Sequence, residues 1–381
     1  MDYGFDEDQA SFRAELRRWA SQVLAPQYQA DDRAGQFRPE LATAMAGMEL
    51  TSLRIPARYG GQGASAVDAG VAAEEVGRAD FNAGYLLINT ALISDILVRN
   101  ATDEQQAAWL PGIASSEILP CIAITEPGHG TDAANLQLRA TPEGDGWRLQ
   151  GEKTSITLGM VATHAVVLAR TGAQGARGVS AFWVGLDHPD ISRSGFDDLG
   201  GRAIGRASLH LDGVPVTRAE LIGREGDGFV SVMQGFDYSR AVIGLLCLGA
   251  AQVSLEEALR WAQDREAFGQ PIGRFQGVSF PLAEAATKLR GARHVCYEAL
   301  WLKDHDRDHR CEAAMAKLWA PKLAVEVIHQ CLLTIGHLAY SSESPIGQRL
   351  RDVIGLEIGD GTAQASKLVI ARRLLGRDAA P

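Results

Sequence analysis

The chain has 381 residues, 46% of them hydrophobic, and is long enough to bury a large core spread over about two or three domains. Its net charge of −10 and pI near 5.4 argue against nucleic-acid and anionic-membrane partners, because both bind clustered basic residues. Five dispersed cysteines include no close pair, so neither a disulfide framework nor a zinc site is indicated, and a reducing cytoplasm is expected.

Residues 1–120 are predicted to form an N-terminal helical domain. The start of the chain lacks a basic region followed by an apolar run, which argues against an ordinary secretory signal. Apolar residues recur at helical spacing from Phe12 to Val23, and further helices are expected at residues 40–50, 67–77 and 82–99.

The helix expected at residues 82–99 is apolar almost all round, as in a buried helix. Its one acidic residue, Asp95, is expected to be a buried, paired structural carboxylate rather than a second catalytic acid, since a buried charge needs a partner. No window of the chain reaches about 18 uninterrupted apolar residues, so no transmembrane helix is expected.

Residues 121–230 are predicted to form a small β-barrel or sandwich domain. Short apolar or alternating runs bounded by turn residues recur at 135–140, 147–150, 165–169, 180–184 and 208–212. The domain opens on residues 123–132, AITEPGHGTD. This stretch reads as a turn loop, or as backbone that approaches a flat or anionic ligand closely, because glycine removes the side chain that would block the approach.

Residues 231–381 are predicted to form a C-terminal four-helix bundle, with long helical segments at 241–261, 280–302, 310–333 and 362–375. Pro281 is expected at a helix start, whereas Pro321 should kink or break its helix. The predicted fold class is therefore α+β and multidomain.

Further motifs follow the opening stretch in order along the chain. They are GEKTSITL at 151–158, FDYSR at 236–240, REAFGQPI at 265–272 with FQ at 275–276, LTIGHLAY at 333–340 and GDGTAQ at 359–364. In type, order and spacing, this set resembles the acyl-CoA dehydrogenase family across essentially the whole chain. The resemblance implies FAD as cofactor, an acyl-CoA substrate, electron-transfer flavoprotein as acceptor, and a homotetramer built as a dimer of dimers.

The resemblance also implies the flavin contacts. They are Ile122, Ile124, Thr125, Gly130, Thr131, Ser155, Thr157, Arg265, Phe268, Gln276, Gly336, Thr362 and Gln364. In the family, the contacts that correspond to Arg265, Phe268 and Gln276 come from a neighbouring subunit. The chain departs from the family pattern at Ser155, where an aromatic residue is usual, at Leu158 for Asn, and at Leu333 for Gln, with His337 as a candidate replacement.

The implied substrate contacts are Thr131, Phe236, Asp237, Arg240 and Gly361, and the implied catalytic base is Asp360. Here Asp360 stands in the place of the family's Glu, and Gly359 in the place of an aromatic residue. Read without the family, Asp360 to Thr362 is a turn or helix N-cap, and Asp237 with Arg240 is a surface ion pair.

The implied reaction is removal of a proton from the α carbon of an acyl thioester by Asp360, with hydride transfer from the β carbon to flavin N5. The shorter acid, Gly359 and Ser155 together predict a wide, short cavity for a cyclic or α-branched acyl group, such as cyclohexane-1-carboxyl-CoA. Alternatives are an acyl-carrier-protein-linked acyl dehydrogenase, a flavin monooxygenase or oxidase on the same fold, and a non-enzymatic scaffold.

Overall fold

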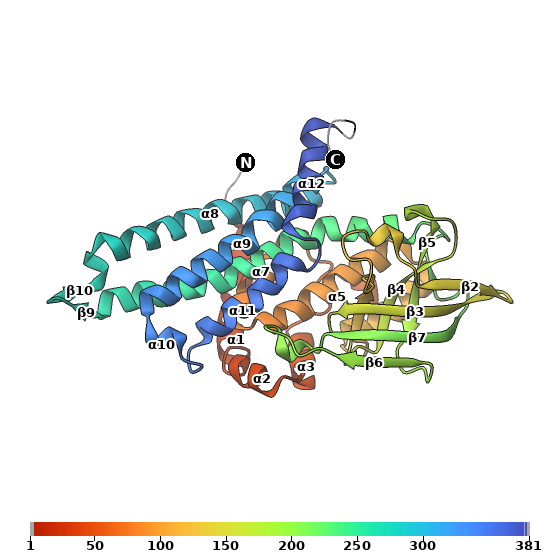
Figure 1. Ribbon diagram of the computed structural model, residues 1–381, viewed down its shortest axis with the longest axis horizontal. Coiled ribbons are helices and arrows are strands. Elements are labelled where there is room, and N and C mark those ends of the chain that lie inside the picture. The colour runs from red at the N-terminus through yellow and green to blue at the C-terminus, as the bar shows by residue number, and fades with distance from the viewer. Residues whose placement is uncertain (1–3, 377, 379–381) are drawn as a thin grey trace.

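The computed structural model describes residues 4–376 and 378. A mixed β-sheet lies at one end of the molecule, the long helices of a bundle extend away from it, and the first helices pack against the side of the bundle (Figure 1). The predicted three-part α+β fold is confirmed.

In the described residues, the N-terminal part contains six α-helices: α1 (Glu7–Val23), α2 (Tyr28–Ala34), α3 (Pro39–Gly47), α4 (Ala66–Ala79), α5 (Phe81–Asn100) and α6 (Asp103–Ala114). Helix α1 begins at a capping box in which Asp6 accepts from the amide of Gln9 at 2.8 Å. Helices α2 and α6 were not predicted. Helix α5 is buried over most of its length, as its all-round apolar pattern predicted.

Eight strands of the middle part join in one sheet: β1 (Pro120–Ala123), β2 (Arg139–Glu143), β3 (Gly146–Ile156), β4 (His164–Arg170), β5 (Val179–Gly185), β6 (Ile191–Gly195), β7 (Ala207–Val216) and β8 (Leu221–Ile222). The order is β6-β7-β3-β2-β4-β5-β8, and β1 pairs with β4 in parallel. The strand predicted at 135–140 starts later, at Arg139. The reason is that the amides of Gln137 and Leu138 donate to the Glu126 carboxylate, at 2.6 and 2.8 Å, instead of to a strand.

The C-terminal part contains α7 (Gly228–Asp264), α8 (Gln276–Asp304), α9 (Arg310–Ile335), α10 (His337–Tyr340), α11 (Pro345–Ile358) and α12 (Ala363–Leu375). A hairpin of β9 (Glu266–Ala267) and β10 (Gln270–Pro271) joins α7 to α8. Both proline predictions need correction. Helix α8 begins before Pro281, which is therefore interior, and α9 runs through Pro321 without a break because packing against neighbouring helices outweighs the lost hydrogen bond.

Helix α7 is the centre of the core and packs against α4, α5, α8 and α9. It crosses α4 closely, since a Cβ on Gly249 would lie 2.1 Å from the carbonyl oxygen of Glu74. By length and composition alone, α5 and α7 could cross a membrane, but 89% and 72% of their most apolar windows are buried inside the protein. Core helices of soluble proteins have the same composition, so these two helices do not by themselves indicate a membrane span.

Candidate active site

Asp360 lies in the turn between α11 and α12. The chain reverses there through two residues with positive φ, 55° at Asp360 and 98° at Gly361. Thr362 then caps α12, its side chain accepting from the amide of Ala365 at 3.2 Å. The turn-and-cap interpretation is therefore correct for the backbone, and it leaves the Asp360 carboxylate free to have a chemical role.

The Asp360 side chain is half-buried next to two cations. Burial raises its pKa, and the positive charges of Lys317 and Arg240 oppose that rise. Arg240 pairs with Asp237 at 2.8 Å, and these side chains are only 15% and 16% exposed, so the pair is not on the open surface as the family-free interpretation proposed. Burial also raises the pKa of Asp237, against the pull of Arg240.

Phe236, the aromatic member of the same motif, is only 6% exposed and packs in an apolar core cluster. Its predicted contact with substrate stays a prediction.

Tyr85 of α5 reaches the same region. Its hydroxyl oxygen lies 3.2 Å from where a Cβ on Gly355 would stand, so the glycine leaves room for the ring. Burial raises the pKa of Tyr85 well above its usual value, and the carboxylates of Asp352 and Asp360 raise it further. The structure thus brings together an acid, a phenol and two cations from α5, α7, α9 and the α11–α12 turn.

The opening stretch of the middle domain is a loop held from inside by the Glu126 carboxylate. This carboxylate pairs with the buried Lys153 at 2.8 Å, and Lys153 also donates to the carbonyl of Ile124 at 3.0 Å. Burial opposes ionisation of Glu126, but Lys153 and two backbone amides outweigh it and lower the pKa. Burial lowers the pKa of Lys153 to about 8 against the attraction of Glu126. These ties fix the loop that carries Thr125, Gly130 and Thr131.

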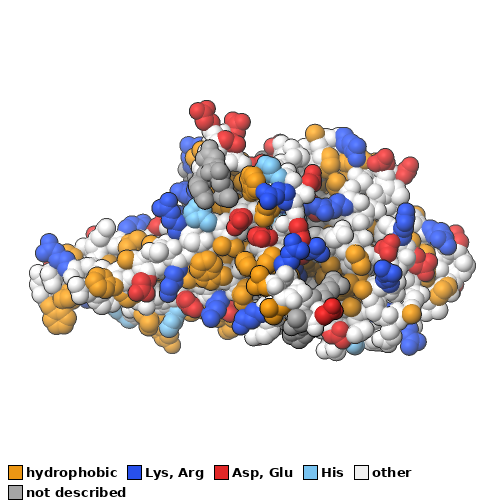
Figure 2. Space-filling model, turned by 90° about the horizontal axis from the view of Figure 1, so that it is seen from above, with side chains coloured by type: hydrophobic (Ala, Val, Ile, Leu, Met, Phe, Trp, Pro, Cys, Tyr) orange, Lys and Arg blue, Asp and Glu red, His pale blue; other side chains and the backbone are white. Residues whose placement is uncertain are grey.

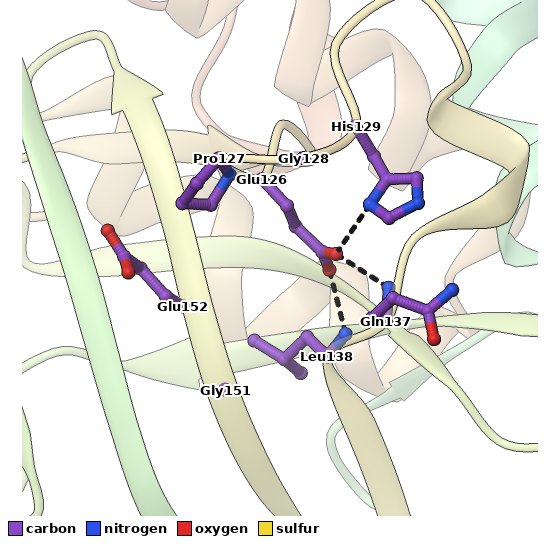
Figure 3. A pocket seen from close by; sticks show the side chains of 8 residues that line it. All are labelled: Glu126, Pro127, Gly128, His129, Gln137, Leu138, Gly151 and Glu152. Atoms are coloured by element: carbon purple, nitrogen blue, oxygen red, sulfur yellow. Dashed lines mark hydrogen bonds and ion pairs between the residues drawn. The ribbon is translucent and has the colours of Figure 1, made fainter.

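This loop lines a cavity of about 280 Å³. Figure 3 shows the residues that line it, with His129 turned toward Glu126. The distance from His129 Nδ1 to Glu126 Oε2 is 3.6 Å. The cavity is lined by residues of the loop and of neighbouring segments and does not include Asp360 or Arg240.

Ser155, in the place of the family's aromatic residue, is exposed at a bulge where φ is 59°. Its hydroxyl accepts from Arg206 at 3.0 Å. Arg206 also pairs with Asp198 and lies 4.2 Å from the centre of the Phe196 ring. A guanidinium therefore lies beside the position that the missing aromatic side chain would occupy. Thr157 follows this bulge and is half-buried.

The remaining predicted flavin contacts fall into two groups. Ile122, Ile124, Thr125, Gly130 and Thr131 belong to β1 and the loop after it, in the sheet domain. Arg265, Phe268 and Gln276 belong to the β9–β10 hairpin and the start of α8, at the opposite end of the molecule (Figure 1). One chain does not bring these two groups together.

The second group is exposed to solvent in the single chain. Phe268 is 96% exposed at a φ of 53°, and Arg265 and Gln276 are also exposed. Gly336 lies between α9 and α10, near the exposed Leu333 and His337, while Thr362 and Gln364 begin α12. The exposed guanidinium and aromatic ring of one group, and the glycines and threonine hydroxyls of the other, are chemically suited to a phosphate-bearing aromatic cofactor.

Sequence reasoning missed Lys317, Tyr85 and Arg206. Of these three, only Lys317 could have been found from the sequence. Most residues three or four positions away from it on α9 are alanines, so a cation stands on an otherwise small, apolar helix face. Among the described residues, no group of three or more His, Cys, Asp or Glu side chains is placed to hold a metal ion.

Comparison with known proteins agrees with this geometry. The N-terminal, middle and C-terminal domains of acyl-CoA dehydrogenase match residues 6–117, 121–214 and 226–375. Probable acyl-CoA dehydrogenase YngJ of Bacillus subtilis (strain 168) is 34% identical over 98% of this chain and 100% of its own.

Three solved structures are also similar. Butyryl-CoA dehydrogenase from Megasphaera elsdenii has a TM-score of 0.95 at 28% identity, covering 98% of this chain and 100% of its own. The FAD complex of PigA has a TM-score of 0.95 at 25% identity, covering 99% of this chain and 100% of its own. The prolyl acyl carrier protein oxidase AnaB has a TM-score of 0.94 at 26% identity, covering 98% of this chain and 100% of its own. From the three matched domains and the near-complete coverage, we conclude that the chain belongs to the acyl-CoA dehydrogenase family.

Proposed function

We propose that this enzyme removes the α proton of an acyl-CoA thioester with Asp360 as the base. The observation that supports this role is the half-buried Asp360 carboxylate beside Lys317 and Arg240. Burial raises the pKa of this carboxylate. A carboxylate with a raised pKa is a stronger base, and a dry pocket raises it further once substrate excludes water.

FAD is the cofactor, and when bound it accepts the hydride that leaves the β carbon. The α proton of a thioester is too weakly acidic for a carboxylate unless the developing negative charge on the carbonyl oxygen is stabilised. We propose the backbone N–H of Asp360 for this role, and one such donor is typically worth about 3 to 4 kcal/mol.

The acyl group is proposed to be cyclic or α-branched, with cyclohexane-1-carboxyl-CoA as the specific candidate. Asp360 is one methylene shorter than Glu and reaches roughly 1.5 Å less far. Gly359 and Ser155 remove two large side chains from the neighbourhood. In this proposal, a bulky ring fills more of the space beside the shorter base than a linear chain does and brings its α carbon closer to it.

The decisive experiment is anaerobic titration of the FAD-loaded protein with a panel of acyl-CoAs, repeated with Asp360→Asn. Rapid flavin bleaching by cyclohexanecarboxyl-CoA that is lost in Asp360→Asn is the expected result. Unimpaired bleaching in the variant would remove Asp360 as the base. Rapid bleaching by butyryl-CoA alone would remove the cyclic substrate.

The active assembly is proposed to be a cytoplasmic homotetramer that passes electrons to electron-transfer flavoprotein. The separation of the two flavin-contact groups at opposite ends of one chain supports an assembly of at least two subunits. Exposed apolar side chains near the second group, including Phe268, Leu333 and Tyr340, give that end a surface on which another subunit can pack. Figure 2 shows hydrophobic side chains at that far end of the bundle.

A second candidate is an enzyme that acts on acyl groups carried by a carrier protein. The similarity to a prolyl acyl carrier protein oxidase favours it. The two candidates are separated by comparing CoA and carrier-protein thioesters of the same acid, and by measuring oxygen consumption. Slow reoxidation in air indicates a dehydrogenase, whereas rapid oxygen uptake indicates an oxidase or monooxygenase.

A further inference from the structure

Lys317 is a buried cation in the middle of α9, with only 2% of its surface exposed. Its Nζ donates to the carbonyl of Leu356 at 2.7 Å and to the carbonyl of Gly361 at 2.8 Å. Leu356 is in the last turn of α11, and Gly361 follows Asp360 directly. The ammonium group therefore connects the two sides of the turn that carries Asp360.

This turn needs such a connection for two reasons. The last carbonyls of a helix have no partner within the helix, and one of them here is the buried Leu356 carbonyl. In addition, Asp360 has a φ of 55°, a left-handed conformation that is unfavourable for most residues other than glycine and persists only where its surroundings hold it. The hydrogen bonds from Lys317 lie on both sides of this strained residue.

Burial is the largest influence on the Lys317 ammonium group, and the net effect, to which the positive charge of Arg240 adds, is a lowered pKa. Burial lowers the pKa of Lys317, while the negative charge of Asp360 opposes that change, and Cys247 and Glu357 act in the same direction as Asp360. The other titratable groups that face Lys317 or Asp360 are Arg240 of α7 and Tyr85 of α5. Lys317 thus acts on Asp360 both through the backbone and through its charge.

We propose that Lys317 is a positioning residue that clamps the Asp360 turn and so aims the carboxylate at the substrate α carbon. The inference rests on the proposed role of Asp360 as base, because a clamp matters to catalysis only if the clamped group reacts. The backbone part of the inference concerns residues 356–361 alone and can be measured without any substrate.

The first measurement is hydrogen–deuterium exchange in the FAD-loaded protein, comparing Lys317→Met with the unchanged enzyme. Loss of both hydrogen bonds should speed exchange in the peptide covering residues 356–364 by about tenfold, a factor that corresponds to about 1.4 kcal/mol of lost local stability. Lys303→Met, which removes another buried lysine of the bundle that pairs with Asp95, is the matched control and should leave this peptide unchanged.

The second measurement is the rate of flavin reduction. A turn that holds Asp360 loosely should slow reduction by about a hundredfold while changing the substrate Kd by less than about threefold, because the acid moves but the CoA contacts do not. Lys317→Arg, which keeps a cation and several donors, should recover part of the rate, whereas Lys317→Gln should recover little.

Unchanged exchange at residues 356–364 in Lys317→Met would overturn the clamp whatever Asp360 does. If Lys317→Met does not fold, exchange at residues 356–364 is compared between Lys317→Gln and the unchanged enzyme. The glutamine side chain is shorter than lysine and does not reach both carbonyls as well, so faster exchange is still expected. Faster exchange together with an unimpaired Asp360→Asn would instead show that the clamp exists and that Asp360 is not the base.

Discussion

The proposed function makes the reach of Asp360 the residue-scale feature on which substrate choice depends. Its backbone position is fixed by the turn and by the two carbonyl contacts of Lys317, so the position of the carboxylate depends mainly on the length of the side chain. A change in that length tests whether the enzyme is matched to a bulky acyl group.

Asp360→Glu should extend the carboxylate by roughly 1.5 Å and slow reduction by cyclohexanecarboxyl-CoA about a hundredfold, because the longer acid no longer meets the α carbon at the right distance. The ratio of the butyryl-CoA rate to the cyclohexanecarboxyl-CoA rate should rise. Stopped-flow flavin reduction measures both rates. Equal losses with the two substrates would contradict the match between a short base and a bulky substrate.

Asp95 is the residue whose structural role the sequence predicted and the contacts confirm. It is 7% exposed and pairs with Lys303 at 3.2 Å, Arg99 at 3.0 Å and Arg54 at 3.4 Å. Lys303 also lies 4.8 Å from the ring centre of the buried Tyr238. Asp95 is therefore the carboxylate that these three cations share.

Asp95→Ala should destabilise the fold by about 3 to 5 kcal/mol, since it leaves the buried Lys303 ammonium without its counter-charge. Glu143→Ala breaks the exposed pair with Arg148 and should cost no more than about 1 kcal/mol. Urea unfolding of the two variants measures the difference. A loss for Asp95→Ala as small as that for Glu143→Ala would show that Lys303 finds another partner or loses its proton.

At the scale of elements, hydrophobic periodicity located most helices, but it did not locate their ends. Helix α7 starts at Gly228, well before the predicted residue 241, and α9 continues through Pro321. Hydrophobic periodicity indicates which face of a helix is buried. The ends of a helix depend instead on capping residues and on tertiary packing, which can compensate for the amide hydrogen bond that a proline lacks. Strands β1, β6 and β8 are short and were missed for a related reason, because each takes its shape from the strand beside it.

The β9–β10 hairpin is the element that we expect to serve a neighbouring subunit. It joins α7 to α8, carries the exposed Arg265 and Phe268, and lies far from the opening loop of its own chain (Figure 1).

Arg265→Ala should lower FAD affinity at least about tenfold, because the proposed bidentate guanidinium–phosphate contact would be lost, while the helical content stays unchanged. Arg274→Ala removes the same charge a few residues further on and is the control. Equilibrium dialysis of FAD with circular dichroism measures both effects. Equal losses of FAD in the two variants would show that general charge, and not the hairpin contact, holds the cofactor.

At the scale of the whole molecule, the three parts meet at Asp352. Tyr28 of α2 donates to Asp352 Oδ2 at 2.6 Å, and the amide of Gly201, in the segment between β6 and β7, donates to Oδ1 at 2.7 Å. A single carboxylate on α11 thus joins the N-terminal helices, the sheet domain and the bundle. Burial raises the pKa of Asp352 to about 6, against the effect of these two hydrogen bonds.

Asp80 is fully buried at the start of α5, and its pKa leads us to expect that the stability of the fold depends on pH. Burial raises its pKa to about 7, against the hydrogen bonds from the amides of Ala83 and Asn82, and Asp31 and Asp352 raise it further. The pKa of an aspartate in the unfolded chain is about 3.9, so between about pH 3.9 and pH 7 the folded protein binds more protons than the unfolded chain. The protonated Asp80 therefore contributes its full stabilisation at low pH, and this stabilisation is lost as the pH rises toward 7.

Asp80→Asn should therefore flatten the fall in apparent melting temperature between pH 5 and pH 8, because asparagine stays neutral and its side-chain oxygen can still accept from the helix amides. Differential scanning fluorimetry across this range measures the change. Asp8→Asn, at an exposed position of α1, should leave the slope as it is. A slope that Asp80→Asn leaves unchanged would assign the pH dependence to other groups.

The sequence by itself determined the order of helical, β and helical parts, the buried character of α5 and the family motifs, because these depend on local composition and spacing. Tertiary structure decided which residues meet. It placed Lys317 and Tyr85 beside Asp360, Arg206 beside Ser155, and the hairpin away from the opening loop. Such contacts join segments that are distant along the chain, so they depend on how helices and strands pack, and no local pattern in the sequence encodes them.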